Sequence, residues 1–334
     1  RTVWLLVRGR LMRKMALCFD SLATQKRDEI FQWLDRASAE LEKMKDRDSP
    51  WWIEWIDLQN DRSWILYWTS RVELMQTHLQ ETREDVFSKG LPRQQAKFRQ
   101  AEIMLDFRRY RYRLDSGTVE NSVLLFDSVS AEKQMVMWIF AGFTKGFVFL
   151  WSERIQEAID QFNLVLPVAI QQGDAVNAGR IFIYRMIAHR RLGELDKVRD
   201  HVGEYFHSGK FATATDGYAD YAHGCHLWVL WMERKYYDMQ PYYDQIAFRF
   251  KPEGTSPFNF LYAFPMAALK NHEGDHAQAV EFLRHMVYLP QRAFEEDLDA
   301  CILRVINAWE KDGFLPYPDA LDEVFELGRR YRYI

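Results

Sequence analysis

The chain has 334 residues, of which 48% are hydrophobic and 28% are charged, and this composition is typical of folded proteins rather than of disordered ones. Its net charge of -4 provides no overall field that would attract nucleic acid or an acidic membrane. Ten prolines and 16 glycines are few turn signals for this length, which favours long helices over a many-stranded sheet. We therefore predict an all-α fold.

The first 130 residues contain long helical patterns but no repeat. Ser49-Pro50 and Gly90-Leu-Pro92 separate these patterns, since proline ends one helix and readily opens another. We predict divergent, Trp-rich helical hairpins over residues 1–130 that continue the repeat array described below, with a separate helical domain as the alternative. The expected helices are 21–47, 62–89 and 92–114, and the expected boundary loop is 115–119.

A strongly apolar stretch follows at residues 134–151 and is almost long enough to span a bilayer. Lys145 lies near its middle, where a charge would cost about 3 kcal/mol on insertion. A helix packed on both sides within a helical array is equally apolar. We predict such a buried helix rather than a membrane span.

Short turn motifs recur from this helix onward. Gly193, Gly274 and Gly313 each lie between two helical patterns, where glycine adopts a left-handed conformation at low energetic cost. Glu153 and Arg234 occupy equivalent places without glycine. The five positions are 40, 41, 40 and 39 residues apart. This spacing predicts about five helix pairs with a period near 40 over residues 131–334, stacked as an α-α superhelix.

Within each pair, apolar residues follow the three-and-four spacing of a helix with one buried face. The second helix of the first pair is predicted at 155–172, and its counterpart in the fourth pair at 275–289, ending at Pro290. The second pair is predicted as helices 175–190 and 196–207. One pair cannot bury these faces alone, whereas stacked neighbours can.

These pairs resemble tetratricopeptide repeats. The small and aromatic positions of that family are matched by Gly146, Phe149, Ala158 and Phe162 in the first pair, and the fourth pair is matched by Ala267, Gly274, Ala279 and Pro290. Met186 and Leu227 depart from the pattern, and the family's usual period is about 34. Longer repeats of this kind are similar to the sensor regions of bacterial signal-transduction ATPases and LuxR-type regulators. The resemblance implies a protein- or ligand-binding scaffold or sensor.

Residues on the first helix of the second pair are the leading candidates for a binding site. Arg180, Arg185 and His189 would form a cationic stripe, together with Arg190 and Arg191. In the family, these helices line the concave surface, so the stripe would bind an acidic peptide, a partner protein, another domain of a larger chain or a small anionic ligand. The expected aromatic companions are Tyr184, Tyr218, Tyr221, Trp228 and Tyr262.

Two stretches interleave basic and aromatic residues, at 107–113 and 329–333, a pattern that can grip phosphates and stack on bases. Nucleic-acid binding is therefore an alternative function. The slightly acidic chain favours the simpler interpretation, in which aromatic residues point inward and arginines are solvated.

His223, Cys225 and His226 form the densest group of potential metal ligands. Zinc needs three or four ligands, and no second pair at a suitable spacing is visible, so we predict no metal and no cofactor. Catalytic motifs are also lacking, so we predict a binding protein rather than an enzyme, with an unrecognised site in the N-terminal region as the alternative. Three widely spaced cysteines (Cys18, Cys225 and Cys301) and the lack of a signal-peptide pattern predict reduced thiols and a cytoplasmic location.

Overall fold

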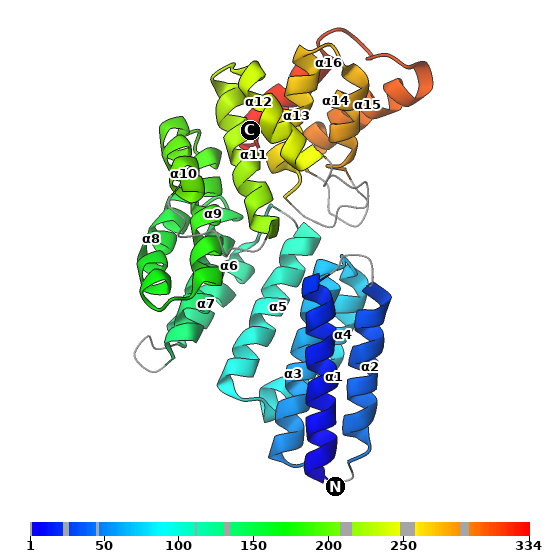
Figure 1. Ribbon diagram of the computed structural model, residues 1–334, viewed down its shortest axis with the longest axis vertical. Helices are drawn as coiled ribbons and strands as arrows, with labels where there is room; N and C mark the ends of the chain where they lie inside the picture. Colours follow the sequence, from blue (N-terminus) through cyan, green and yellow to red (C-terminus); the bar gives the residue numbers. More distant parts are fainter. Residues whose placement is uncertain are drawn as a thin grey trace. The chain divides into compact units, whose positions relative to one another are not determined.

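A computed structural model describes residues 2–22, 27–44, 47–110, 112–129, 134–207, 216–247, 258–287 and 294–334. These residues form sixteen helices and no strand, which confirms the predicted all-α class (Figure 1). The chain divides into two compact units, Arg1–Arg109 and Tyr110–Ile334, and each is described by itself below. None of the helices described here combines the length and apolarity needed to cross a membrane.

The first unit is built on the antiparallel pair α1–α2 and on α3, which packs against both. Its core contains Leu34, Leu41 and Trp51, each at most 1% exposed. Asp48 caps α3, because its carboxylate accepts the amide N–H of Trp51 at 3.2 Å. The helices are α1 Thr2–Leu22, α2 Arg27–Glu42, α3 Ser49–Trp68, α4 Val72–Lys89 and α5 Pro92–Tyr110.

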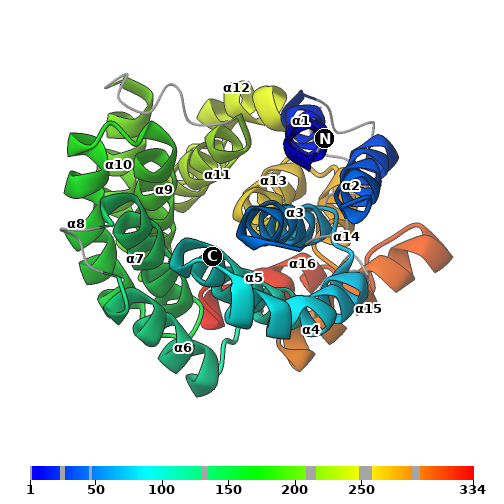
Figure 2. The same cartoon turned by 90° about the horizontal axis from the view of Figure 1, so that it is seen from below.

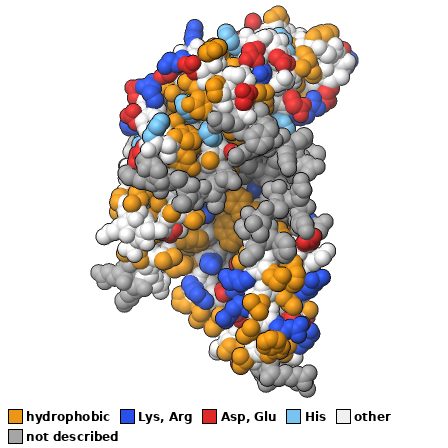
Figure 3. All heavy atoms as spheres, in the orientation of Figure 1, with side chains coloured by type: hydrophobic (Ala, Val, Ile, Leu, Met, Phe, Trp, Pro, Cys, Tyr) orange, Lys and Arg blue, Asp and Glu red, His pale blue; other side chains and the backbone are white. Residues whose placement is uncertain are grey.

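All three helices predicted for this region differ from the structure. The predicted helix 21–47 covers the end of α1 and all of α2, which ends at Glu42, and the predicted helix 92–114 is α5, which ends at Tyr110. The predicted helix 62–89 is the end of α3 and all of α4, because the chain turns at Ser70, which has φ of 57°. No glycine or proline marks that turn, so the pattern concealed it. The chain up to Leu22 is also helical, with Val3, Trp4 and Leu11 exposed at 72%, 62% and 57%. Figure 3 shows hydrophobic and basic side chains next to one another over α1.

Half-buried His78 on α4 makes the first unit sensitive to acid. Its Nε2–H donates to the carbonyl of Gln59 at 3.0 Å, and burial lowers the pKa of His78 to about 4. The unfolded chain, with an ordinary histidine pKa, binds this proton between about pH 6.5 and pH 4, whereas the folded chain does not. The contribution of neutral His78 to the free energy of unfolding is therefore fully present above about pH 6.5. It is lost as the pH falls through this window toward about 4.

We expect His78→Gln, which keeps a donor but cannot titrate, to flatten the dependence of the free energy of unfolding on pH in this window. The full shift corresponds to on the order of 3 kcal/mol, because each pKa unit corresponds to about 1.4 kcal/mol. Urea unfolding at a series of pH values measures the slope. Identical slopes for the two proteins would contradict the assignment.

The second unit consists of α6 to α16, with a regular order of contacts. Consecutive members contact each other in the series α7, α9, α11 and α13. The helix before it is contacted by each of α8, α10, α12 and α14 (Figures 1 and 2). The helices are α6 Ser116–Asp127, α7 Met135–Leu150, α8 Ile155–Gln171, α9 Ala175–Arg191, α10 Leu195–His207, α11 Asp216–Met232, α12 Tyr236–Ala247, α13 Phe260–His272, α14 His276–Arg284, α15 Glu296–Asp312 and α16 Ala320–Arg330.

The five predicted turn positions are confirmed. Glu153, Gly193, Arg234, Gly274 and Gly313 all have positive φ, between 57° and 77°, and each lies between two helices. Three are glycines, which adopt this conformation without strain, whereas for a residue with Cβ it costs about 1–2 kcal/mol. Glu153 and Arg234 therefore hold a conformation that is unfavourable for their residue types.

A small residue and an aromatic residue of the first pair pack against each other between α7 and α8. A Cβ on Gly146 of α7 would lie 2.5 Å from the ring of Phe162 on α8, so only glycine allows these helices to approach so closely. The buried helix predicted at 134–151 is α7, and Lys145 lies 4.8 Å from the ring centroid of Phe126. The predicted helix 275–289 is α14, which already ends at Arg284, and Pro290, its predicted end, lies outside the described residues.

The expected loop at 115–119 is instead the beginning of α6. The Asp115 carboxylate accepts the amide N–H of Thr118 at 2.8 Å, which is the bond of a helix cap. An Asp-Ser-Gly sequence favours both a loop and a helix start, and the cap decides between them here. The division between the compact units, after Arg109, also precedes this segment.

Candidate functional site

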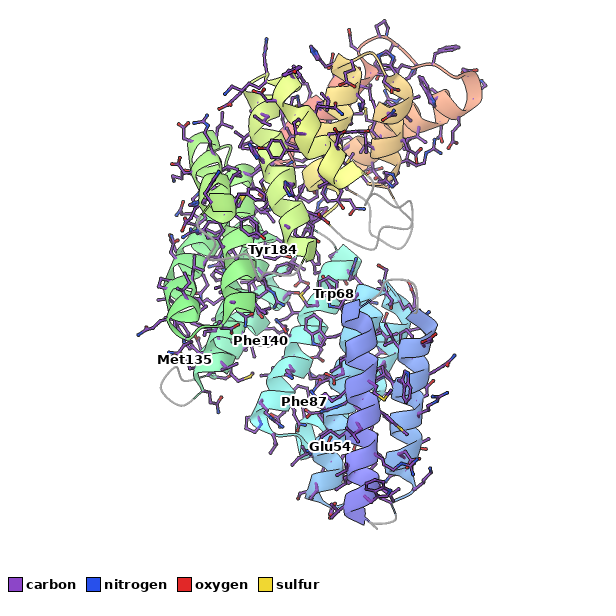
Figure 4. All side chains as sticks on the ribbon, in the orientation of Figure 1. Glu54, Trp68, Phe87, Met135, Phe140 and Tyr184 are labelled. Carbon is purple, nitrogen blue, oxygen red and sulfur yellow. The ribbon has the colours of Figure 1, made fainter. Side chains whose placement is uncertain are left out.

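The structure separates the predicted concave-face residues into two groups, because neighbouring positions on a helix differ by about 100° in direction. Tyr184 on α9 is 5% exposed, and its ring packs 5.3 Å from Phe143 and 5.6 Å from Phe258 (Figure 4). Arg180, one turn earlier on the same side, lies 5.0 Å from the Phe143 ring. Tyr221 also packs against Phe258, at 5.5 Å.

Arg185 and His189 point to a different side of α9, toward α8 and α10. Arg185 donates to the side-chain oxygen of Asn163 at 3.2 Å, and burial lowers the pKa of this guanidinium. His189 lies 2.6 Å from Glu194 and is 6% exposed, and burial lowers its pKa. The predicted stripe is therefore divided between two faces of the helix.

The remaining predicted aromatic residues are also held by internal contacts. Trp228 is 2% exposed and packs beside Arg190, and the hydroxyl of Tyr262 donates to Asn259 at 2.7 Å. Burial raises the pKa of Tyr262 well above its usual value. The side chain of Tyr218 lies outside the described residues. Such burial suits core packing better than an open groove, and the predicted binding role of these residues stays a prediction.

The adjacent Arg190 and Arg191 are buried structural groups. The Arg190 guanidinium is 1% exposed and donates to three backbone carbonyls, and burial lowers its pKa to about 10, so it stays charged at neutral pH. Arg191 donates to the carbonyl of Leu150 and to the carboxylate of Glu153, both at 2.6 Å. The sequence placed both residues in a solvated cationic groove, which is wrong for these two side chains.

The basic-aromatic stretches also make internal contacts. Arg108 is 2% exposed and donates to the carbonyl of Tyr67 at 3.1 Å, and Phe107 is fully buried. In the second stretch, Tyr333 is 2% exposed and Arg330 lies 3.6 Å from Asp297. These contacts bury part of each stretch, whereas the side chains of Arg113 and Arg330 are 61% and 69% exposed, and nucleic-acid binding stays a prediction.

Ionisable groups converge in the first unit, where the sequence left an enzyme as an alternative. Arg13 on α1 is 6% exposed and lies 3.1 Å from Asp57, 3.5 Å from Asp61 and 3.9 Å from Glu54, all on α3 (Figure 4 labels Glu54). Arg10 also pairs with Glu54. Because every carboxylate faces an arginine, the cluster is accounted for as a set of ion pairs that joins α1 to α3.

An open groove of about 770 Å³ lies at the turn between α11 and α12. Among its lining residues, Arg234, Lys235 and Arg329 are cationic and Asp238 is acidic. The remaining lining residues are mostly aromatic and comprise Trp231, Tyr236, Tyr237 and His272, with Met232. A groove lined by cationic and aromatic side chains suits an extended anionic ligand, whose charges pair with the cations and whose chain packs against the rings.

The aromatic part of the groove is partly ordered by internal stacking. Tyr236 and His272 stack with ring centroids 3.8 Å apart, and Arg329 lies 5.7 Å from the Trp231 ring. Tyr237, by contrast, is 93% exposed. An aromatic residue this exposed is unusual, and beside a groove it offers a surface on which a ligand can pack.

Arg234 distinguishes this groove from a charged surface of the ordinary kind. It occupies a left-handed turn position at which Gly193, Gly274 and Gly313 stand in three other turns. Glu153, the other exception, pairs with Arg191 and Arg332, whereas the exposed Arg234 guanidinium has no ion pair within the part of the chain that the structure describes. Backbone strain without an internal interaction to explain it points to a functional constraint.

Sequence reasoning identified position 234 as a turn without glycine but did not treat it as a candidate site. The arginine at a turn position where three other turns have glycine was the signal that could have identified this site. Arg329 belongs to a stretch that the sequence associated with nucleic acid, and its place beside Trp231 depends on how α16 packs, which spacing alone does not reveal. No three ligands of the His, Cys, Asp or Glu type are grouped to hold a metal among the described residues.

Comparison with protein-family models and with curated proteins gives no match to this sequence.

Proposed function

We propose that the chain is a helical-repeat binding module of the tetratricopeptide kind, which binds an acidic peptide segment of a partner protein. The regular contacts among α7 to α14 and the left-handed turns about 40 residues apart support the repeat architecture. The location proposed here is the groove around Arg234. The scaffold would act by recognition, as part of a sensor or signalling assembly in the cytoplasm, with no catalytic step.

The observation that carries the proposal is the exposed, strained Arg234 beside Lys235, Arg329 and Tyr237. Two of these cations already pair with acids, Lys235 with Glu233 at 2.8 Å and Arg329 with Glu326 at 2.6 Å. Both pairs are solvent-exposed and therefore weak, so a carboxylate ligand can compete for them. Arg234 is free to offer a bidentate contact.

We expect Arg234→Gly to weaken peptide binding and to stabilise the fold at the same time. Glycine removes the left-handed strain, so the free energy of unfolding should rise by about 0.5–1 kcal/mol. Loss of a charge-assisted contact should weaken binding about tenfold. Fluorescence anisotropy with a labelled peptide of alternating glutamate and glycine measures binding, and urea unfolding measures stability.

Lys311→Glu on α15 is the matched control for Arg234→Glu, because both change the net charge equally, both side chains are exposed, and Lys311 does not line the groove. Only the groove variant should lose affinity, and added salt should weaken binding to the unmodified protein. Equal losses of peptide affinity for the two variants would mean that only the net charge of the protein matters. That result would contradict the proposed groove.

A further inference from the structure

A second hollow, of about 400 Å³, lies between α10, α11 and α12 and shares none of its lining residues with the groove. Its volume falls within the range of about 300–1,000 Å³ that is typical of small-molecule sites. Its walls are formed mainly by rings. They comprise Phe206 and His207 from α10, His223 and His226 from α11, and Tyr242 from α12, with Arg199, Val202 and Gly203 completing the lining.

Four of these rings form one cluster. The centroid of Phe206 lies 4.7 Å from His223 and 6.4 Å from His226, and Tyr242 lies 4.1 Å from His226 and 6.0 Å from His223. His223 and His226 are three residues apart, so both project from one face of α11. Rings at these distances and mixed angles present both faces and edges, which suits a flat aromatic guest.

Gly203 keeps the hollow open. It stands inside α10, where glycine is about 1 kcal/mol less favourable than alanine. No heavy atom lies within 4 Å of the Cβ that a larger residue would have, so close helix packing does not explain this glycine. A side chain at this position would enter the open space and fill it.

The polar groups of the hollow specify a neutral guest that donates a hydrogen bond. The Nδ1 atom of His226 is buried and has no hydrogen-bond partner within the described part of the chain. Burial lowers the pKa of His226, so the ring is uncharged at neutral pH, and in the tautomer with its proton on Nε2 the Nδ1 atom accepts a hydrogen bond. The one arginine in the lining, Arg199, pairs with Glu233 and lies 2.7 Å from Asp196, which leaves little net charge for an anion.

We propose that this ring-lined hollow is a binding site for a small, neutral, planar aromatic compound that stacks between the rings and donates one N–H or O–H to His226. The site shares no lining residue with the peptide groove, and binding at each is measured with its own ligand and variants. A module with both sites would combine partner binding with sensing of a small molecule.

The test compares indole with indene, which has nearly the same shape but no N–H. Isothermal titration calorimetry measures affinity, and NMR of protein labelled with ¹⁵N-histidine reports on the imidazoles. We expect saturable indole binding, shifts of the His223 and His226 ring nitrogens, and about five- to tenfold weaker binding of indene, the factor expected for one hydrogen bond.

Two variants and one control test the parts of the proposal separately. Gly203→Leu should fill the hollow and abolish indole binding while leaving the melting temperature unchanged or raised, because leucine favours the helix. Asp200→Leu adds the same side chain to α10 outside the hollow and should bind indole normally. His226→Phe keeps the ring but removes the acceptor, so indole and indene should then bind equally.

Absence of indole binding to the unmodified protein would overturn the proposal, as would normal binding by Gly203→Leu. A preference for indole over indene that survives in His226→Phe would overturn the assigned hydrogen bond. Because peptide binding is measured separately with the Arg234 variants, neither result depends on the proposed groove.

Discussion

Arg190→Met is expected to lower the free energy of unfolding of the protein by about 3–5 kcal/mol, the range for removing one member of a buried, charged hydrogen-bond network. Arg190 donates to the carbonyls of Leu261 at 2.5 Å, Tyr333 at 3.2 Å and Gly224 at 3.3 Å. Methionine fills much of the same space but donates nothing. The carbonyls of three separate segments would then lose a donor in a buried site.

The local backbone explains why one side chain reaches two of these segments, at Gly224 and Leu261. A Cβ on Gly224 would lie 3.1 Å from the Leu261 carbonyl oxygen, so glycine allows α11 and α13 to approach closely there. Arg190→Lys is the control, because an ammonium group lacks the planar fork and should give an intermediate loss. Guanidinium chloride unfolding measures both variants. A loss below about 1 kcal/mol for Arg190→Met would contradict this role.

Trp51→Ala is expected to destabilise the first unit by about 3–5 kcal/mol, because it leaves a large cavity in the core. The indole is 1% exposed, its ring centroid lies 4.8 Å from Trp52 and 5.9 Å from Trp55, and its Nε1–H donates to the carbonyl of Leu41 at 2.9 Å. That carbonyl lies in the last turn of α2 and also accepts the amide N–H of Met44 at 3.0 Å, so the indole is its second donor.

Trp51→Phe separates the two contributions of this side chain. Phenylalanine keeps most of the packing but loses the hydrogen bond, so we expect a loss of about 1–2 kcal/mol. Trp4→Ala is a matched surface control, since Trp4 is 62% exposed, and should change stability by less than about 0.5 kcal/mol. Urea unfolding followed by circular dichroism tests this order, which equal losses for the two Trp51 variants would contradict.

The sequence predicted the second unit better than the first because its turns carry a repeating signal. Glycine at three positions fixed the register, and the spacing then located Glu153 and Arg234, where residue type alone would not have indicated a left-handed turn. The repeat spacing was recognised only from Glu153 onward, so it did not reach the break between α3 and α4. Ser70 adopts the same conformation there without a local signal, so two helices were predicted as one.

The candidate site was less predictable, because side-chain burial depends on neighbours that are distant in sequence. Arg185 and Arg190 lie on the same helix, yet one donates to an asparagine side chain at an exposed position and the other to three buried carbonyls. A run of basic residues is compatible with either environment. The ring-lined hollow includes the histidines first considered as metal ligands, but Phe206 and Tyr242 join them only after α10 and α12 pack against α11.

Hydrogen exchange with and without the glutamate-glycine peptide tests the central claim most directly, because it locates the site along the chain. We predict added protection at the α11–α12 turn, residues 231–238, and around Arg329 in α16, the segments that line the groove. Protection confined to α9, Ala175–Arg191, would instead favour the concave face. That result, or no change anywhere in the chain, would contradict the proposed groove.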